Sequence, residues 1–272
     1  MSAHVPDWSQ DPPPFDISTA HPARVYDFLL GGKDNFAADR AAAEAIIEVS
    51  PVVFACVRAN RAFLQRAVRY LAGQAGIRQF LDIGTGLPTA DNTHQVAQQV
   101  APESRVVYVD NDPIVLAHAR ALLTSAQPGA CDYVDADLRD TDEVLRRAAE
   151  TLDFDKPVAV MVLCTMQYVP DADDPHAIIS RLMGAVPSGS YLAMSDTTRD
   201  IDTETMTTGA ARYNAKLGSA VFTPRTGAEY ARFFDHLALV EPGLVPMPQW
   251  RPDHDPGSSE VIPMYAAMGR KP

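Results

Sequence analysis

A short apolar stretch that carries an acid and runs into two glycines has the clearest chemical meaning in this sequence. Residues 80–83 contain Asp82 and lead into Gly84, Thr85 and Gly86. Glycine adopts positive φ without strain and lets a ligand approach the backbone closely. At the carboxyl end of a central parallel strand, such a turn lies where nucleotide ligands bind. The pattern predicts a nucleotide-holding turn, with a plain strand-to-helix turn as the structural alternative.

The third glycine of a dinucleotide-binding fingerprint is missing. It would fall at position 89, where the chain has Thr89 preceded by Pro88. That glycine allows close packing of the helix on the strand beside a pyrophosphate. The sequence therefore favours a cofactor without a pyrophosphate over a nicotinamide dinucleotide.

Acids at the ends of the next two expected strands extend the pattern. Asp110 follows the glycine turn by somewhat more than ~20 residues and is placed to accept hydrogen bonds from both hydroxyls of a ribose. Asp112 is expected to cap the next helix, which leaves Asp110 for a ligand. After the third strand, Asp137 can accept from an exocyclic amine while Leu138 packs on an adenine ring. Each acid alone has a structural alternative, but three successive strand ends indicate an adenosine site.

The elements around these residues alternate between strand and helix. Such alternation predicts right-handed crossovers and a doubly wound α/β fold. Two further strands after this series suggest a seven-stranded, mostly parallel sheet with a reversed last strand. The expected strands are 80–83, 106–110, 132–134, 158–164, 190–195, 237–240 and 261–268. The expected helices among them are 92–100, 113–123, 142–151, 174–186, 203–217 and 226–234, and a proline-rich excursion is expected at 243–259.

The chain is expected to divide into three parts. Residues 1–14 are polar and proline-rich and predict a flexible arm. Residues 15–75 predict a helical lid or cap, and residues 76–272 a cofactor-binding domain. The first helix is expected to begin at Ser18 or Thr19, because hydroxyl side chains cap helices. It should end at Gly31 and Gly32, and two further helices are expected at about 39–49 and 51–73.

Composition limits the classes of function. The 272 residues are 46% hydrophobic, so a substantial core can form, and the net charge is −12. A strongly acidic chain is poorly suited to binding nucleic acid, which needs a positive surface. No nucleic acid is therefore expected as a partner. No apolar run is long enough to span a bilayer, so no membrane is expected either. The three widely spaced cysteines fit reduced thiols, and a cytoplasmic location is expected.

Metal and hydrolase chemistry have little support. Cys56, Cys131 and Cys164 are odd in number and widely spaced, which disfavours a disulfide framework and a zinc cluster. No His-Glu-x-x-His and no Gly-x-Ser-x-Gly occurs in the sequence, so neither a zinc protease nor an α/β-hydrolase is indicated. No metal is expected.

Four blocks of the sequence resemble a bacterial family of S-adenosyl methyltransferases whose substrates are largely unknown. The blocks are 21–35, 82–89, 107–115 and 135–139, and the resemblance covers about residues 15–272. It implies the Rossmann-like fold of class I methyltransferases, S-adenosyl-L-methionine as cofactor, and methyl transfer. It does not imply a particular acceptor.

The resemblance also implies how the cofactor is held. It places the methionine part beside the glycine turn, the ribose beside Asp110 and Asn111, and the adenine beside Asp137. The N-terminal block is expected to form a lid or clamp on the amino-acid end of the cofactor. Independently of the resemblance, Asn60 with Arg61 is expected on a turn that could face the cofactor. The candidate cofactor-binding residues are Arg24, Tyr26, Gly31, Asn35, Asp82, Gly84, Thr85, Gly86, Asp110, Asn111, Asp137, Leu138 and Cys164.

Catalytic residues are less well indicated. Relatives often carry a histidine after the fourth strand, where this chain has Met166, Gln167 and Tyr168. Methyl transfer mainly needs alignment in a dry site, and a base is needed only if the acceptor must lose a proton. Tyr168, His21 and Tyr213 are candidate bases, and each has a core or surface role as its alternative.

The sequence thus predicts an S-adenosylmethionine-dependent methyltransferase acting on a small-molecule acceptor. A non-catalytic protein that binds the same cofactor for regulation is the main alternative. A nicotinamide-dependent oxidoreductase is less favoured because of Thr89. The acceptor, the acceptor atom and the oligomeric state stay open.

Overall fold

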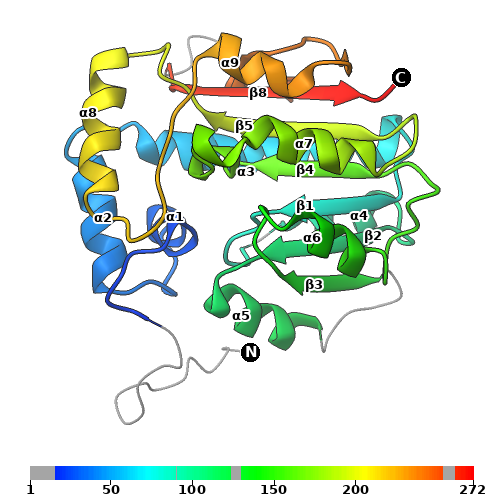
Figure 1. Ribbon diagram of the computed structural model, residues 1–272, viewed down its shortest axis with the longest axis horizontal. Coiled ribbons are helices and arrows are strands. Elements are labelled where there is room, and N and C mark those ends of the chain that lie inside the picture. Colours follow the sequence, from blue (N-terminus) through cyan, green and yellow to red (C-terminus); the bar gives the residue numbers. More distant parts are fainter. Residues whose placement is uncertain (1–15, 90, 124–129, 254–260) are drawn as a thin grey trace.

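The computed structural model describes residues 16–89, 91–123, 130–253 and 261–272 (Figure 1). The arm expected at residues 1–14 and part of the excursion expected at 243–259 lie outside these ranges. In the part of the chain that is described, no helix is long and apolar enough to cross a membrane.

One mixed sheet organises the molecule. Its main path has seven strands in the order β3-β2-β1-β4-β5-β8-β6, and a short β7 pairs with β8 off that path. Strands β1 to β5 are parallel, while β8 runs antiparallel to both β5 and β6. The predicted seven-stranded sheet with one reversed strand is confirmed. The strands are β1 Gln79–Ile83, β2 Arg105–Asp110, β3 Cys131–Asp135, β4 Ala159–Leu163, β5 Tyr191–Thr197, β6 Ala238–Leu239, β7 Val245–Pro246 and β8 Met264–Arg270.

The central strands are buried on both faces, which explains their nearly continuous apolar sequences. Alternate residues of β1 point to opposite sides of the sheet. Leu81 and Ile83 pack in one core with the helices α6 Thr141–Ala148 and α7 Pro175–Gly184, which lie in front of the sheet in Figure 1. Phe80 packs in the opposite core with α3 Val53–Arg69 and α4 Thr93–Val100.

The N-terminal helices gather at the carboxyl ends of the parallel strands. Figure 1 shows α1 Pro22–Leu29, α2 Ala37–Ile47 and α8 Thr203–Asn214 at the end toward which the arrows of β1, β4 and β5 point. These three helices share a third apolar core that includes Val25, Ala42 and Tyr213. The segment 15–75 therefore contributes side chains to two apolar cores. Helix α3 packs on the sheet, while α1 and α2 pack with α8.

The predicted start of the first helix is wrong. Helix α1 begins at Pro22, and His21 is its cap residue, with Nδ1 lying 3.3 Å from the Ala23 amide nitrogen. Proline suits the first helical position because it has no N–H to leave unpaired there. Ser18 and Thr19 instead donate their hydroxyls to the carboxylate of Asp16.

The other boundaries differ by a few residues. Helix α3 continues as a π-helical turn over Tyr70–Gln74, and the helix expected at 226–234 is α9 Gly227–Ala231 followed by a 3-10 turn. Helix α5 spans Pro113–Leu123 as predicted. The described part of the proline-rich excursion holds β7 and a 3-10 turn at Met247–Gln249.

Candidate functional site

A cavity of about 560 Å³ lies over the carboxyl ends of the parallel strands. Its volume falls in the range of about 300–1,000 Å³ that is usual for small-molecule sites. The walls come from the loops after β1, β2, β3 and β4 and from α1 and α3. Eleven of the predicted cofactor-binding residues line it together: Arg24, Tyr26, Asp82, Gly84, Thr85, Gly86, Asp110, Asn111, Asp137, Leu138 and Cys164.

The glycine turn needs both of its glycines. Gly84 and Gly86 have φ of 70° and 64°, a region that other L-residues rarely adopt. A Cβ atom on Gly84 would lie 2.3 Å from Oγ1 of Thr165, whereas one on Gly86 would meet nothing within 4 Å. Gly84 thus allows close packing against the loop after β4, and Gly86 leaves open space beside the cavity.

Asp110 is held in place by backbone amides. Its Oδ2 accepts from the Gly86 amide at 2.8 Å, and its Oδ1 accepts from the Asp112 amide at 3.0 Å. Burial raises the pKa of this carboxyl, although the two amides act in the opposite direction. A carboxylate offers about four lone-pair sites. With two of them used, Asp110 keeps acceptor capacity for two hydroxyl groups of a ligand.

Asp82 fastens the turn to the next helix. Its Oδ2 accepts from Oγ1 of Thr93 at 2.6 Å, at the start of α4. Burial raises the pKa of Asp82 to about 6, with the Thr93 hydrogen bond acting against that rise. A buried carboxyl with one short hydrogen bond is well suited to fixing the end of β1.

Asp137 has a competing partner. Its Oδ1 accepts from Nε of Arg139 at 2.9 Å, and Oδ2 lies 3.5 Å from Nδ2 of Asn111. The Arg139 hydrogen bond is the main reason that the pKa of Asp137 is lowered. Arg139 also reaches Asp173 at 3.2 Å. The carboxylate faces the cavity as predicted, and any ligand amine must share it with this arginine.

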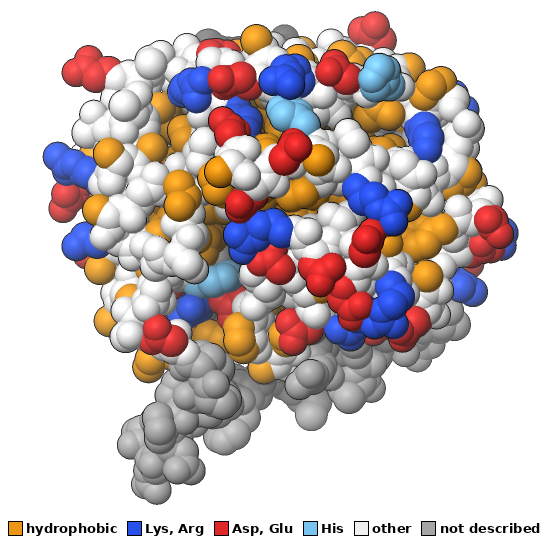
Figure 2. Space-filling view, viewed as in Figure 1, with side chains coloured by type: hydrophobic (Ala, Val, Ile, Leu, Met, Phe, Trp, Pro, Cys, Tyr) orange, Lys and Arg blue, Asp and Glu red, His pale blue; other side chains and the backbone are white. Residues whose placement is uncertain are grey.

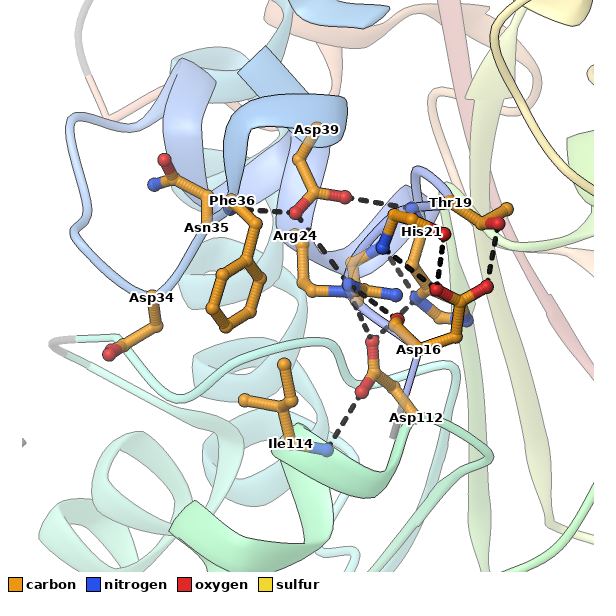
Figure 3. A network of polar contacts seen from close by, with 12 residues as sticks. Asp16, Thr19, His21, Arg24, Asp34, Asn35, Phe36, Asp39, Asp112 and Ile114 are labelled. Carbon is orange, nitrogen blue, oxygen red and sulfur yellow. Dashed lines mark hydrogen bonds and ion pairs between the residues drawn. The ribbon is translucent and has the colours of Figure 1, made fainter. Parts of the chain in front are cut away.

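A buried ionic network fixes α1 onto the loop after β2, as Figure 3 shows. Arg24 donates from Nε to Oδ2 of Asp112 at 3.1 Å, and its Nη1 lies 3.7 Å from Oδ2 of Asp39. Nδ1 of His21 lies 2.8 Å from the same Asp112 oxygen. Oδ1 of Asp112 accepts from the Ile114 amide at 2.8 Å, so the predicted helix cap is confirmed.

Charge balance explains why Asp112 tolerates burial. Burial by itself raises the pKa of Asp112, but His21, the Ile114 amide and Arg24 together hold it below its ordinary value. The Arg24 and Asp112 side chains are only 7% and 1% exposed. Arg24 therefore lines the cavity with its charge already compensated, and it supports the cavity wall.

The rest of the N-terminal block shapes the loop after α1. The Tyr26 hydroxyl donates to the Val57 carbonyl at 3.1 Å and lies at the cavity. Gly31 ends α1 with φ of 80°, and Nδ2 of Asn35 donates to Oδ2 of Asp27 at 2.8 Å. Gly31 and Asn35 are not among the described residues that line the cavity. Direct contact of these two with a cofactor remains a prediction.

The cavity also contains residues that the motifs did not indicate. Tyr108 and Tyr133 occupy paired positions of β2 and β3, and their rings stack with centroids 4.8 Å apart. Thr165 follows β4 and packs against Gly84. Asn60 and Arg61, which were expected to face the cofactor, do line the cavity, but from within helix α3 and not from a turn. Oδ1 of Asn60 accepts from the Ser195 hydroxyl at 2.6 Å. The position of Tyr108 and Tyr133 near the ends of two neighbouring expected strands was the sequence signal that could have placed them at the cavity.

The candidate bases, and the nearby Cys164 thiol, are either protonated or paired with another side chain. The Tyr168 and Tyr213 hydroxyls lie 3.3 Å apart, and burial raises the pKa of both phenols. Cys164 has φ of 55°, and burial raises the pKa of its thiol well above the ordinary value. His21 is paired with Asp112. Neither phenol nor the thiol is ionised at neutral pH, so they cannot remove a proton from an acceptor there.

Comparison with known proteins gives a consistent family assignment. The family model described as S-adenosyl methyltransferase matches residues 8–272. A DUF574 family protein from Streptomyces avermitilis is 46% identical, with 94% of this chain and 99% of that chain covered and a TM-score of 0.90. A candidate methyltransferase from Thermobifida fusca is 40% identical, with 97% and 99% covered and a TM-score of 0.89.

More distant likeness concerns the fold alone. An O-methyltransferase family 2 protein from Planctomyces limnophilus is 16% identical, with 91% of this chain and 65% of that chain covered and a TM-score of 0.50. The comparison with functionally curated proteins gives no match.

Proposed function

Because this chain belongs to the S-adenosyl methyltransferase family, we propose that it transfers the methyl group of S-adenosylmethionine to a small-molecule acceptor. The arrangement of Asp110 carries the proposal. This buried carboxylate is held by two backbone amides at the wall of the cavity, beside the glycine turn. It can still accept from two neighbouring hydroxyls, as a ribose requires.

The chain's own residues suggest how the cofactor would lie. The ribose would bind Asp110, the methionine part would lie beside Gly84 and Gly86, and the adenine would lie toward Leu138 and Asp137. The open space at Gly86 leaves room for a ligand to pass close to the backbone. The cofactor supplies a methyl group bonded to a positively charged sulfur. The sulfur becomes a neutral thioether when the methyl group is transferred.

The protein's contribution would be alignment and exclusion of water. Helix α1 lies on the cavity wall, and the buried Arg24–Asp112 pair ties it to the loop after β2. Holding two reactants in line in a dry site lowers the entropic part of the barrier. The network therefore supports a role for α1 as a fixed wall of the reaction site.

The surface supports a small acceptor. Figure 2 shows acidic and basic side chains interspersed over one face of the molecule, without a continuous basic patch on the described part of that face. The net charge of −12 also disfavours an anionic polymer as acceptor.

Isothermal titration calorimetry with S-adenosylmethionine and S-adenosylhomocysteine tests the proposal. We expect saturable binding to one site. Asp110→Ala should weaken binding about 100- to 10,000-fold, because it removes two hydrogen bonds to a charged group, which contribute about 1.5–3 kcal/mol each. Asp155→Ala is the matched control, since Asp155 is an exposed acid before β4, at the opposite edge of the sheet.

Thermal unfolding of both variants separates loss of binding from loss of folding, and Asp110→Asn offers a second variant of nearly the same shape. Absence of binding at millimolar ligand, or equal affinity of Asp110→Ala and the wild type, would contradict the proposal. Binding of both ligands together with failure to form S-adenosylhomocysteine from any acceptor in a metabolite extract would instead favour the non-catalytic alternative.

A further inference from the structure

A second, smaller cavity adjoins the one described above. Its volume is about 90 Å³, and it lies between α1, α2, α3 and α8. Four residues line both cavities: Pro22, Tyr26, Cys164 and Tyr168. The two cavities therefore meet at the loop after β4, on the side where the predicted methionine end of the cofactor lies.

The wall of the second cavity carries no charge. None of the described residues that line it is Asp, Glu, Lys, Arg or His. The uncharged amide of Gln167 is held by two hydrogen bonds, since its Nε2 donates to the Cys164 carbonyl at 3.2 Å and its Oε1 accepts from the Thr197 amide at 3.0 Å. A charged molecule would lose its water there without gaining a counter-charge, which is costly.

Aromatic rings form one side of the cavity. Tyr168, Tyr213 and Phe222 make a three-ring cluster, with centroid separations of 6.5 Å, 5.8 Å and 5.6 Å. Ring faces attract positive charge, and more strongly when water is excluded. Such a cluster suits a reaction in which positive charge passes from the sulfur of the cofactor to an uncharged acceptor atom.

A base for the acceptor is absent from the described lining. Its ionisable groups are Cys56, Cys164 and three tyrosines, and burial raises the pKa of Cys164, Tyr26, Tyr168 and Tyr213. Asp196 lies behind this wall, where its Oδ1 accepts from the Gln167 amide at 3.3 Å, and it does not line the cavity. An acceptor that must lose a proton before it reacts, such as an alcohol, is therefore poorly served.

We infer that the second cavity holds the apolar body of the methyl acceptor, an uncharged small molecule whose accepting atom is a ring nitrogen or a thioether sulfur. This inference rests on the proposed function. The lone pair of the acceptor forms the new bond to the methyl carbon, and the carbon–sulfur bond of the cofactor breaks with its electron pair left on sulfur. The positive charge moves to the acceptor, and no proton has to be removed.

The volume limits the size of the inserted part. A cavity of ~150 Å³ lined by apolar side chains accommodates a benzene ring. The second cavity is smaller, at about 90 Å³. It suits a substituent or the edge of one ring, with the accepting atom where the two cavities meet, beside Tyr26, Cys164 and Tyr168.

The experiment uses 3-methylpyridine as the probe and pyridine-3-carboxylate as its charged counterpart. Binding to the full-length protein saturated with S-adenosylhomocysteine is measured by saturation-transfer NMR at mildly alkaline pH, where the methylpyridine is uncharged. Formation of S-adenosylhomocysteine from S-adenosylmethionine is measured in parallel. We expect 3-methylpyridine to bind at least about tenfold more tightly than the carboxylate.

Two variants on the same helix give the structural control. Ala210 of α8 lines the second cavity, so Ala210→Leu should fill it and weaken probe binding about tenfold or more. Ala211 is the exposed neighbour, so Ala211→Leu should leave binding unchanged. Both variants should bind S-adenosylhomocysteine as the wild type does, which also shows that they are folded.

The outcomes are distinct. If S-adenosylhomocysteine binds, any of three results would overturn the inference. These are equal or tighter binding of the carboxylate, no binding of 3-methylpyridine, and unchanged probe binding in Ala210→Leu. Failure of the wild type to bind S-adenosylhomocysteine would instead contradict the proposed function itself.

Discussion

The two glycines of the turn after β1 should respond very differently to the same substitution. Gly84 and Gly86 have similar positive φ, 70° and 64°. An added Cβ on Gly84 would lie 2.3 Å from Oγ1 and 2.5 Å from Cγ2 of Thr165, whereas on Gly86 it would meet nothing within 4 Å. Gly84→Ala and Gly86→Ala therefore share one backbone penalty, and only Gly84→Ala adds a steric one.

The magnitudes follow from these contacts. Left-handed backbone costs a non-glycine residue about 1–2 kcal/mol, which applies to both variants. Overpacking adds about 1–3 kcal/mol at Gly84. Thr165 cannot turn away freely, because its Oγ1 lies 3.2 Å from the Ile83 carbonyl and 3.0 Å from the Leu163 carbonyl. We expect the free energy of unfolding to fall by about 2–5 kcal/mol in Gly84→Ala and by about 1–2 kcal/mol in Gly86→Ala.

Urea unfolding measures this difference, with an unchanged slope as the check that the same transition is followed. The double variant Gly84→Ala/Thr165→Ala should recover part of the loss, since it removes the two nearest atoms and keeps the Cβ at 2.9 Å. Gly86→Ala should weaken binding of S-adenosylhomocysteine more than its small effect on stability suggests, because its methyl group enters open space at the cavity. Equal loss of stability in the two single variants would refute this reasoning.

Three further predictions concern buried polar groups. Arg24→Met should lower the unfolding free energy by about 3–5 kcal/mol, because it removes the buried cation that lies between the carboxylates of Asp112 and Asp39. Arg69→Met, which breaks an exposed pair, should cost less than about 1 kcal/mol, and equal losses in chemical unfolding would contradict the account. Burial raises the pKa of Asp196 to about 8. The folded protein therefore keeps a proton that the unfolded chain loses above about pH 4, so native stability should fall as pH rises from about 4 to about 8. Asp196→Asn should flatten this pH dependence of stability, and an unchanged slope would contradict the prediction. Asn60→Leu should lower the unfolding free energy by about 1–3 kcal/mol, because it removes the partner of the buried Ser195 hydroxyl, and unchanged thermal stability would count against that.

The sheet could be predicted from the sequence because its physical signals are local. Each central strand is a short apolar run, as burial on both faces requires, and the alternation with helices fixes the direction of the crossovers. The same logic placed Asp82, Asp110 and Asp137 at one edge of the sheet, since parallel strands end at the same edge. The structure brings all three to one cavity.

The contacts that complete the cavity depend on distant residues and could not be predicted in this way. Arg24 pairs with Asp112, which lies 88 positions later, and nothing in either local pattern indicates that contact. Asp16 takes the hydroxyls of Ser18 and Thr19, so the first helix is capped by His21 instead. The second cavity forms only when α8 packs on α1 and α2, and a hydrophobic pattern does not say which helices meet.

A crystal structure with S-adenosylhomocysteine tests the central claim most directly. The account predicts density in the larger cavity, with both ribose hydroxyls bonded to Asp110, the amino-acid end beside Gly84 and Gly86, and the sulfur facing Cys164 and Tyr168. Density for the ligand elsewhere, or a ribose bound without contact to Asp110, would contradict it.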